Sequence, residues 1–262
     1  MKVGIVGYGN MGRAFALGLS SSVGRENILI YEVNEVKSKE AVEDGFATAQ
    51  NLYFLAKNSE ILLIAVKPKD VKGVLQEIKS ELKDKIVVSV AAGLELSFYE
   101  DILGKKAKLV RLMPNINVLV RRGTIAFTHN GNLLEEEVEN LVRVFSTCGS
   151  IYQLSESLFD SFTALAGSSP AFVFSFIDAL ALAGVREGFS YEEALSIVLD
   201  TITGSAELIR VMGGNPNEWS VRVSSPGGTT IEGLAYLERK GFKGTVMRCV
   251  EKTTEKARKL KG

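Results

Sequence analysis

Residues 1–12 read MKVGIVGYGNMG, a short β-branched run followed at once by glycines in the spacing GxGxxG. Gly7 permits a tight turn, Gly9 lets a phosphate approach the backbone, and Gly12 allows a helix to pack closely on the strand. The spacing of apolar residues that follows predicts a helix over Asn10–Leu19, whose first N–H groups carry a partial positive charge. A strand, this turn and a helix in that order predict a dinucleotide site, although a glycine-rich turn occurs in other α/β domains.

Outward from this turn, short β-branched runs alternate with amphipathic segments to about residue 152. The predicted strands are Lys2–Val6, Ile28–Tyr31, Glu60–Ile64, Ile86–Val90, Lys108–Leu112 and Gly123–Thr128, with a last one near Gly149–Leu154. The predicted helices between them include Asn34–Asp44, Asp70–Leu82 and Leu134–Phe145. This alternation is typical of a parallel sheet wound with right-handed crossovers.

The composition changes after Ser155, where Leu, Ala, Phe and Gly dominate and every segment has helical length and period. We therefore expect two domains, 1–154 with the α/β pattern and 155–262 with helices alone. Pro170 marks the first turn of a segment that runs to about Glu187 and is apolar on nearly every face. A helix of that kind is buried on all sides. The helical domain is too small to surround it, which predicts burial by a second copy of the chain.

Charge and cysteine content exclude several classes of function. The chain has 31 basic and 31 acidic residues, so no sequence-wide positive field attracts nucleic acid or a membrane surface. Cys148 and Cys249 lie far apart without the spacing of a metal site, and we expect no metal and a reducing compartment. No signal peptide and no apolar run of membrane-spanning length is evident, which favours the cytoplasm and a small-molecule ligand.

Glu32 lies at the end of the second predicted strand, about 20 residues beyond Gly12, where a carboxylate binds the adenosine ribose hydroxyls. A carboxylate there repels the 2′-phosphate of NADP, and no arginine follows closely to hold one, although Lys37 and Lys39 are within reach. NADH is therefore weakly favoured over NADPH. The neighbouring Glu35, or a purely surface role for Glu32, is the alternative.

Three segments follow the ends of predicted strands, where ligands bind in open α/β sheets. They are Ala65–Pro68, Ala91–Gly93 and Met113–Asn115. Small residues there let a nicotinamide ring lie against the backbone, and Asn115 could orient a polar group. Plain strand-to-loop turns are the alternative for each.

Two further stretches of small residues stand before predicted helices in the second half, Gly167–Ala171 and Ser224–Thr230. The second precedes an amphipathic run that carries Ile231, Leu234 and Leu237. Amides from Gly227 onward would point out of a helix start, which is a ready site for a carboxylate. Capped turns between helices are the alternative interpretation.

Taken together, these motifs resemble the pyrroline-5-carboxylate reductase family over almost the whole chain and in the right order. The matching segments are Gly7–Gly12, Ala65–Pro68, Ala91–Gly93, Arg111–Asn115, Gly167–Ala171 and Ser225–Thr230, the last followed by Ile231 and Leu237–Gly241. The resemblance implies an N-terminal Rossmann-like dinucleotide-binding domain followed by an all-helical dimerisation domain. It also implies a homodimer, which in this family is often assembled further into a ring of dimers.

The family's reaction is hydride transfer from NADH or NADPH to C5 of 1-pyrroline-5-carboxylate, which yields L-proline. By position in the motifs, Thr230 is the expected catalytic residue, since its hydroxyl would hydrogen-bond the ring nitrogen. The expected substrate-binding residues are Ser225, Gly227, Gly228, Thr229, Asn115 and Ser168. The expected cofactor-binding residues are Gly7, Tyr8, Gly9, Asn10, Met11, Gly12, Glu32, Asn51, Ala65, Val66, Lys67, Pro68, Ala91, Ala92 and Gly93. Glu32 departs from the family pattern, in which members using NADPH carry Ser, Thr or an Asn-Arg pair.

The chemistry agrees with this resemblance, because an imine accepts hydride as the iminium and needs no strong general base. His129, the only histidine, falls in a predicted polar turn, and no histidine or lysine stands in the two small-residue stretches of the second half. A related imine or hydroxy-acid reductase is one alternative. A non-catalytic dinucleotide-binding regulator is another, although it has no need of a substrate carboxylate site.

Overall fold

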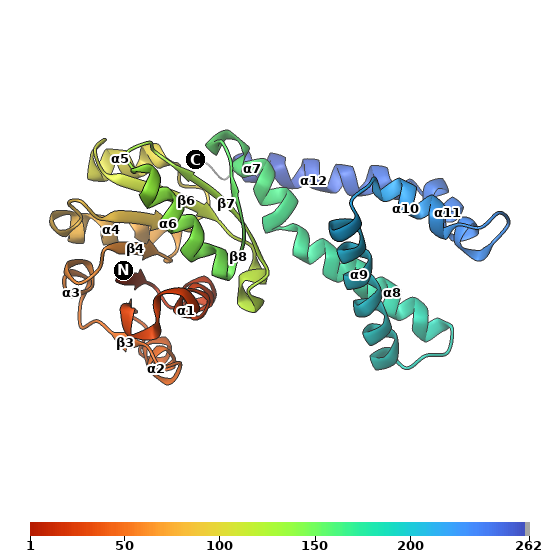
Figure 1. The fold of residues 1–262 in the computed structure, drawn as a ribbon, viewed down its shortest axis with the longest axis horizontal. Helices are drawn as coiled ribbons and strands as arrows, with labels where there is room; N and C mark the ends of the chain where they lie inside the picture. Colours follow the sequence, from red (N-terminus) through yellow and green to blue (C-terminus); the bar gives the residue numbers. More distant parts are fainter. Residues whose placement is uncertain (260–262) are drawn as a thin grey trace. The chain divides into compact units, whose positions relative to one another are not determined.

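The computed structural model describes residues 1–259 and divides into two compact units. Unit 1 contains Met1–Ser168 together with the described residues from Thr254 onward, and unit 2 contains Ser169–Thr253. Figure 1 traces the chain through both units. The domain boundary expected between residues 154 and 155 stays a prediction.

Unit 1 is built on one eight-stranded sheet in the order β3-β2-β1-β4-β5-β6-β7-β8. Its strands are β1 Val3–Val6, β2 Ile28–Tyr31, β3 Ala47–Thr48, β4 Ile61–Ile64, β5 Ile86–Ser89, β6 Lys108–Met113, β7 Gly123–His129 and β8 Gly149–Gln153. β1, β4 and β5 are buried along their whole length, which is why their sequences are continuous apolar runs rather than alternating ones. Each predicted strand is present, and the two-residue β3 was not predicted.

One pairing departs from the expected parallel arrangement, because β6 and β7 run antiparallel. The segment between them is short and holds only the 3-10 turn Ile116–Val120. A parallel crossover needs about a dozen residues or more, usually including a helix, so this linker can only return the chain beside β6 in the opposite direction. The other pairs in the sheet are parallel.

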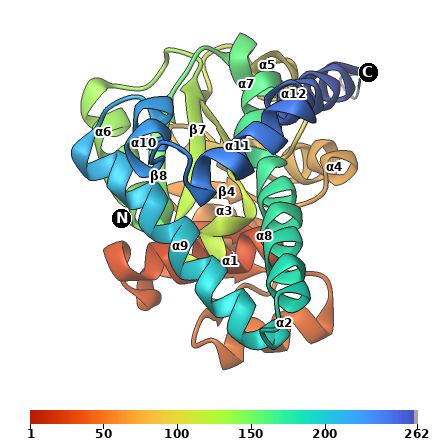
Figure 2. The same cartoon turned by 90° about the vertical axis from the view of Figure 1, so that its right-hand side faces the viewer.

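Helices cover both faces of the sheet. They are α1 Asn10–Val23, α2 Glu35–Glu43, α3 Leu52–Lys57, α4 Pro68–Ile78, α5 Leu96–Leu103 and α6 Glu135–Phe145. One apolar core joins α1, α2 and α6 to the sheet, and a second core joins α3, α4 and α5 to its other face. In Figure 2 the strands lie between α6 and α4. The Rossmann-like fold class is confirmed, with the carboxyl ends of β1, β4 and β5 at one edge of the sheet.

Unit 2 consists of helices and turns. The short α7 Phe159–Phe162 and a π-helical turn at Thr163–Gly167 precede it, and it contains α8 Ser169–Arg186, α9 Tyr191–Met212, α10 Pro216–Val223, α11 Thr229–Arg239 and the start of α12 Phe242–Lys259. α8 and α9 pack side by side (Figure 1). A Cβ on Gly184 of α8 would lie 2.8 Å from the Cβ of Ala194 on α9, so this contact is close enough to require a glycine.

The apolar helix α8 is largely exposed in the single chain. Only Pro170 and Ala181 are buried, whereas Phe174 and Phe176 are 58% and 42% exposed. Contrary to the expectation from sequence, the helical run Glu156–Arg186 is long and apolar enough to cross a membrane by length and composition alone, and 11% of its most apolar window is buried. One such helix is weak evidence of a membrane span. An apolar surface of this extent marks an interaction site.

Candidate functional site

The glycine-rich turn is packed so tightly that two of its glycines cannot be replaced. Gly7 has a φ of +98°, and a Cβ there would stand 2.8 Å from the main-chain oxygen of Ala65. A Cβ on Gly12 would lie 2.0 Å from the oxygen of Gly7. The turn is therefore closed against the Ala65–Pro68 segment that follows β4. Two of the predicted cofactor segments are thus in direct contact.

The outer side of this turn is open to a ligand. A Cβ on Gly9 would meet only the ammonium group of Lys37, at 3.6 Å. α1 begins after Gly9 with no side-chain cap and no acidic residue in its first turn, which contains Asn10 and Met11. The exposed helix amides and the nearby ammonium group fit an anionic pyrophosphate.

Tyr8 is buried, and its side chain anchors the turn. Its hydroxyl donates to Asp44 at 2.7 Å, and Arg13 forms a bidentate pair with the same carboxylate at 2.6 and 3.0 Å. The hydrogen bond from Arg13 holds the pKa of Asp44 below its usual value, and burial raises the pKa of Tyr8. Since the Tyr8 ring packs inward, only its main chain faces the open side of the turn.

Glu32 lies where the sequence predicts, at the end of β2 and beside the glycine-rich turn. Its carboxylate accepts from the amide of Tyr8 at 2.6 Å and from that of Asn34 at 2.8 Å. Each oxygen keeps a lone pair for a ribose hydroxyl. Asn51 has a local role as the N-cap of α3, accepting from the amide of Phe54 at 2.7 Å.

A cavity of about 520 Å³ opens in unit 1 beside the ends of β4, β5 and β6. Pro68, Ala92 and Gly93 line it, and they belong to two predicted cofactor segments. In the same turns, Ala65 and Ala91 follow their strands directly and Lys67 is the N-cap of α4. The rest of the lining is Lys69, Leu94, Arg111, Asp160, Thr163 and Ala257. Its small-residue wall suits a flat ring.

Asn115 is 5% exposed, and its side chain joins two elements. Its carbonyl accepts from the amide of Thr124 at 3.1 Å, and its amide donates to the main-chain oxygen of Ala166 at 3.1 Å. A Cβ on Gly167 would lie 3.3 Å from the Cε of Met113. Ser168 follows directly, after the π-helical turn. Two motifs far apart in sequence therefore meet here, while direct substrate contact by Asn115 and Ser168 stays a prediction.

In unit 2, the predicted carboxylate site forms the start of α11. Gly227 has a φ of +66°, the amide of Gly228 donates to the oxygen of Ser225 at 3.0 Å, and Gly228 is the N-cap residue. No side chain caps the helix, so the amides of Thr229 and Thr230 stand at an uncapped start. α11 is eleven residues long, and the free N–H groups at its start are donors for a carboxylate.

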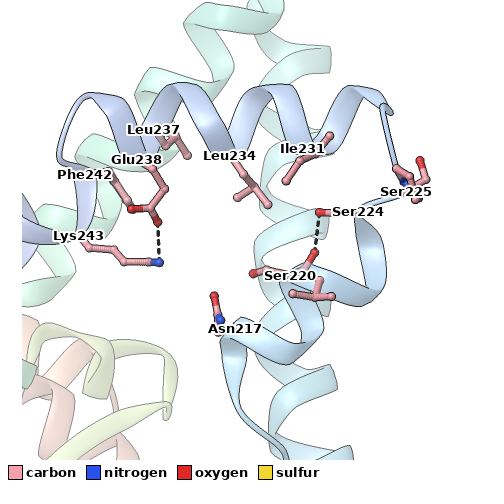
Figure 3. Close-up of a pocket in the computed structure, with 12 residues that line it drawn as sticks. Asn217, Ser220, Ser224, Ser225, Ile231, Leu234, Leu237, Glu238, Phe242 and Lys243 are labelled. Carbon is pink, nitrogen blue, oxygen red and sulfur yellow. Dashed lines mark hydrogen bonds and ion pairs between the residues drawn. The ribbon is translucent and has the colours of Figure 1, made fainter.

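A groove of about 530 Å³ adjoins this segment between α10 and α11 (Figure 3). In Figure 3 Ser225 lies at one end of the groove, and an ion pair of 2.5 Å between Glu238 and Lys243 lies at the other. Between them the wall is mostly apolar, and Ile231 and Leu234 point from α11 toward α10 in Figure 3. Such a groove suits a hydrophobic side chain or helix rather than the charged substrate.

The histidine and the buried cysteine of unit 1, which are residue types often used in acid–base or metal chemistry, lie in local structural environments. The Nδ1 of His129 accepts from the amide of Gly131 at 3.1 Å in a surface turn. Burial raises the pKa of Cys148 to about 11, so its thiol stays protonated. Among residues 1–259, no group of three His, Cys, Asp or Glu side chains is placed to hold a metal ion.

Several cavity residues were not expected from the sequence. Asp160 and Thr163 reach the cavity from α7 and the π-helical turn, and no motif marks them. Arg111 was noted only as part of a motif, yet it lines the cavity and pairs with Glu156 at 2.8 Å. An arginine inside a buried strand run is a usable signal, because it requires a partner carboxylate.

Two family models match the chain. One is described as pyrroline-5-carboxylate reductase dimerisation and matches residues 156–260, and the other is described as NADP oxidoreductase coenzyme F420-dependent and matches residues 2–93. The chain is 56% identical to the pyrroline-5-carboxylate reductase of Aquifex aeolicus over 99% of its length and 97% of that protein. It is 36% identical to the Escherichia coli enzyme of the same name, over 99% and 98% of the two chains.

Solved structures agree with the sequence comparison. The Plasmodium falciparum pyrroline carboxylate reductase with NADP bound matches with a TM-score of 0.89 and 32% identity, over 100% of this chain and 98% of that one. The Streptococcus pyogenes 1-pyrroline-5-carboxylate reductase matches with a TM-score of 0.88 and 35% identity, over 98% of both chains.

Proposed function

The chain belongs to the pyrroline-5-carboxylate reductase family, and from this premise we propose how its residues perform the reaction. It is an oxidoreductase that reduces 1-pyrroline-5-carboxylate to L-proline with a nicotinamide cofactor, the last step of proline biosynthesis. The observation that carries the proposal is the closed contact between Gly7 and Ala65, which leaves Gly9 and the start of α1 open at the edge of the sheet.

The cofactor is assigned to unit 1. The amides at the start of α1 bind the pyrophosphate, and the Glu32 carboxylate binds the adenosine ribose. The nicotinamide lies in the cavity, against the Ala65–Pro68 and Ala91–Gly93 turns. When bound, the reduced nicotinamide supplies a hydride. We favour NADH, because Glu32 has the charge that repels a 2′-phosphate, while Lys37 stands beside Gly9 and favours an anionic cofactor of either kind.

The substrate is assigned to the start of α11. The amides of Thr229 and Thr230 hold the carboxylate, since that of Gly228 already donates to the oxygen of Ser225. The Thr230 hydroxyl faces the ring nitrogen. As C5 receives the hydride, the C=N π pair becomes a lone pair on nitrogen, and Thr230 donates a hydrogen bond to it. Proton transfer by a strong base is unnecessary, because the imine reacts as the protonated iminium.

The homodimer is supported by the dimerisation model over residues 156–260 and by the exposed apolar face of α8. We assign the groove between α10 and α11 to the same interface, since its apolar wall needs a cover. Further assembly into a ring of dimers and a cytoplasmic location follow from the family resemblance and complete the proposal.

The direct test mixes the protein with pyrroline-5-carboxylate and NADH and follows the loss of NADH absorbance. Rapid turnover with this imine, and slow turnover with other cyclic imines and with keto acids, is the expected result. Faster turnover of a keto acid would favour a hydroxy-acid reductase. Binding of NADH without turnover of any compound in the panel would favour a regulator.

A further inference from the structure

A polar network lies behind the Ala91–Leu96 turn in unit 1. It consists of Ser89, Tyr99, Arg111 and Glu156, which we name the turn clamp. We propose that the turn clamp positions the nicotinamide wall of the cavity for hydride transfer, so that its members are positioning residues of the reductase. This proposal rests on the assignment of the nicotinamide to that cavity.

The clamp holds the first end of the turn through Ser89. The Ser89 hydroxyl accepts from the amide of Ala91 at 3.2 Å and shares a 2.6 Å hydrogen bond with the hydroxyl of Tyr99. Ser89 and Tyr99 are 1% and 2% exposed. Buried hydroxyls keep hydrogen-bond partners, so these two bonds hold this end of the turn in place.

The second end of the turn is held by Glu156. One carboxylate oxygen accepts from the amide of Leu96 at 2.9 Å and from Arg111 at 2.8 Å. Arg111 is 3% exposed, and its guanidinium lies over the ring of Phe159 at 4.7 Å. The guanidinium is thus held on two sides, and loss of the Glu156 carboxylate would leave this buried charge without its ion-pair partner.

Between the two anchors, Ala92, Gly93 and Leu94 line the cavity, and Arg111 of the clamp lines it as well. Ser89 and Arg111 are also direct partners in the β5–β6 register, so the clamp is attached to two neighbouring strands. Gly93 has a φ of +80° and gives the turn no rigidity of its own. The position of this wall therefore depends on the anchors at each end.

A buried ion pair is poor evidence for added stability, because well-packed apolar residues often serve as well. Here the carboxylate of the pair also binds a main-chain amide of the turn that lines the cavity, so the pair affects the position of that turn. A displacement of about 1 Å in a reactive geometry can lower a rate by about 100-fold. Loosening the clamp should therefore impair hydride transfer more than it impairs binding of the adenosine half of the cofactor.

The test uses Ser89→Ala and Glu156→Gln in the full chain, after the wild type has been shown to reduce pyrroline-5-carboxylate. We expect kcat/KM for the imine to fall by roughly 10- to 100-fold. The kinetic isotope effect with NADH deuterated at the transferred hydrogen should rise, because hydride transfer becomes rate-limiting. Affinity for ADP-ribose, which lacks the nicotinamide, should stay unchanged.

Two matched controls distinguish an effect on the position of the turn from a general loss of protein stability. Ser59→Ala removes another buried serine hydroxyl, bonded to the Leu55 oxygen at 2.7 Å before β4. Glu137→Gln weakens another ion pair, with Lys108, at the start of α6. Both should keep the wild-type isotope effect. Tyr99→Phe removes only the hydroxyl that bonds Ser89 and replaces the other variants if they fail to fold. A smaller fall in kcat/KM and a smaller rise in the isotope effect are expected for it.

The proposal is overturned if active, folded Ser89→Ala, Glu156→Gln or Tyr99→Phe enzymes keep the wild-type kcat/KM and isotope effect. It is also overturned if ADP-ribose affinity falls as much as kcat/KM, since the whole cofactor site would then have been disturbed. Failure of the wild type to reduce any imine would instead contradict the proposed function.

Discussion

The side-chain amide of Asn115 donates to the main-chain oxygen of Ala166 at 3.1 Å. In a regular α-helix that oxygen accepts from the N–H at position 170, and Pro170 has none. The chain passes through a π-helical turn just before this point, with the amide of Ser168 donating to the oxygen of Thr163 at 2.8 Å. Asn115 thus supplies the donor that the proline removes, and it ties the end of β6 to this turn.

Replacing Asn115 with alanine should lower stability by about 2–4 kcal/mol, because the oxygen of Ala166 and the amide of Thr124 both lose a buried partner. The urea midpoint at fixed protein concentration measures this. In a Pro170→Ala background the same change should cost less, since residue 170 then offers an N–H to Ala166. Equal costs in both backgrounds would show that Asn115 and Pro170 do not share this oxygen.

Glu32 should give NADH the higher kcat/KM, because its carboxylate stands at the end of β2 beside the glycine-rich turn. Glu32→Ser removes the charge that repels a 2′-phosphate, so it should shift the preference toward NADPH by about tenfold, or about 1.4 kcal/mol. Glu35→Ser, an exposed acid in the first turn of α2, is the control and should leave the ratio unchanged. A tenfold wild-type preference for NADPH would contradict the placement of Glu32 against the ribose.

Thr230→Ala should lower kcat by roughly 10- to 1,000-fold, the effect of losing one positioned polar group at a reacting centre. NADH affinity should barely change, since the cofactor is assigned to unit 1. Thr229→Ala keeps its main-chain amide, so substrate binding through the backbone should persist. Steady-state kinetics and NADH titration distinguish these effects. Wild-type kcat in both variants would mean that neither hydroxyl assists the reaction.

Phe176→Asp should cause aggregation or unfolding rather than a clean monomer. Phe176 is 42% exposed in the single chain and lies 6.1 Å from the ring of Phe242, so a dimer would bury the new charge without a partner. Val36→Asp introduces the same charge at an exposed apolar residue of α2 and should be harmless. Analytical ultracentrifugation measures both variants. A stable wild-type monomer at micromolar concentration would contradict the dimer.

Asp44 should contribute to stability in a pH-dependent way. Its pKa is lowered in the folded state, chiefly by the hydrogen bond from Arg13, so its contribution is present above the unfolded pKa of about 3.9 and is lost as pH falls through the folded value. The Arg13 side chain is 40% exposed, which limits the effect to about 1 kcal/mol.

Melting temperatures of wild type and Asp44→Asn should therefore differ above about pH 4 and converge in more acidic buffer. Glu40→Gln tests the other carboxylate near Arg13, at 3.3 Å and 40% exposed, and should have a smaller effect. A difference between wild type and Asp44→Asn that persists unchanged in acid would show that the Asp44 charge is not responsible.

Much of unit 1 was predictable because its signals are local. The βα periodicities placed the strands within one or two residues, and the GxGxxG turn requires glycine at Gly7 and Gly12 wherever the strand and helix meet. The all-helical character of unit 2 and the apolar composition of α8 were also predicted from the sequence. The antiparallel β7 was not, because strand direction depends on whether a linker is long enough for a crossover, and the periodicity of the strand itself is the same either way.

By itself the sequence determined most of the elements, the glycine-rich turn, the apolar helix and the family, since these depend on residues close together along the chain or on whole-length similarity. Only the tertiary structure decided which distant residues share a function. Asn115 donates to the Ala166 oxygen, for which Pro170 has no N–H. Arg111 and Glu156 hold the turn that follows Ser89. Hydrogen bonds and ion pairs form between atoms that the fold brings within about 3 Å, and one-dimensional spacing carries no record of that distance.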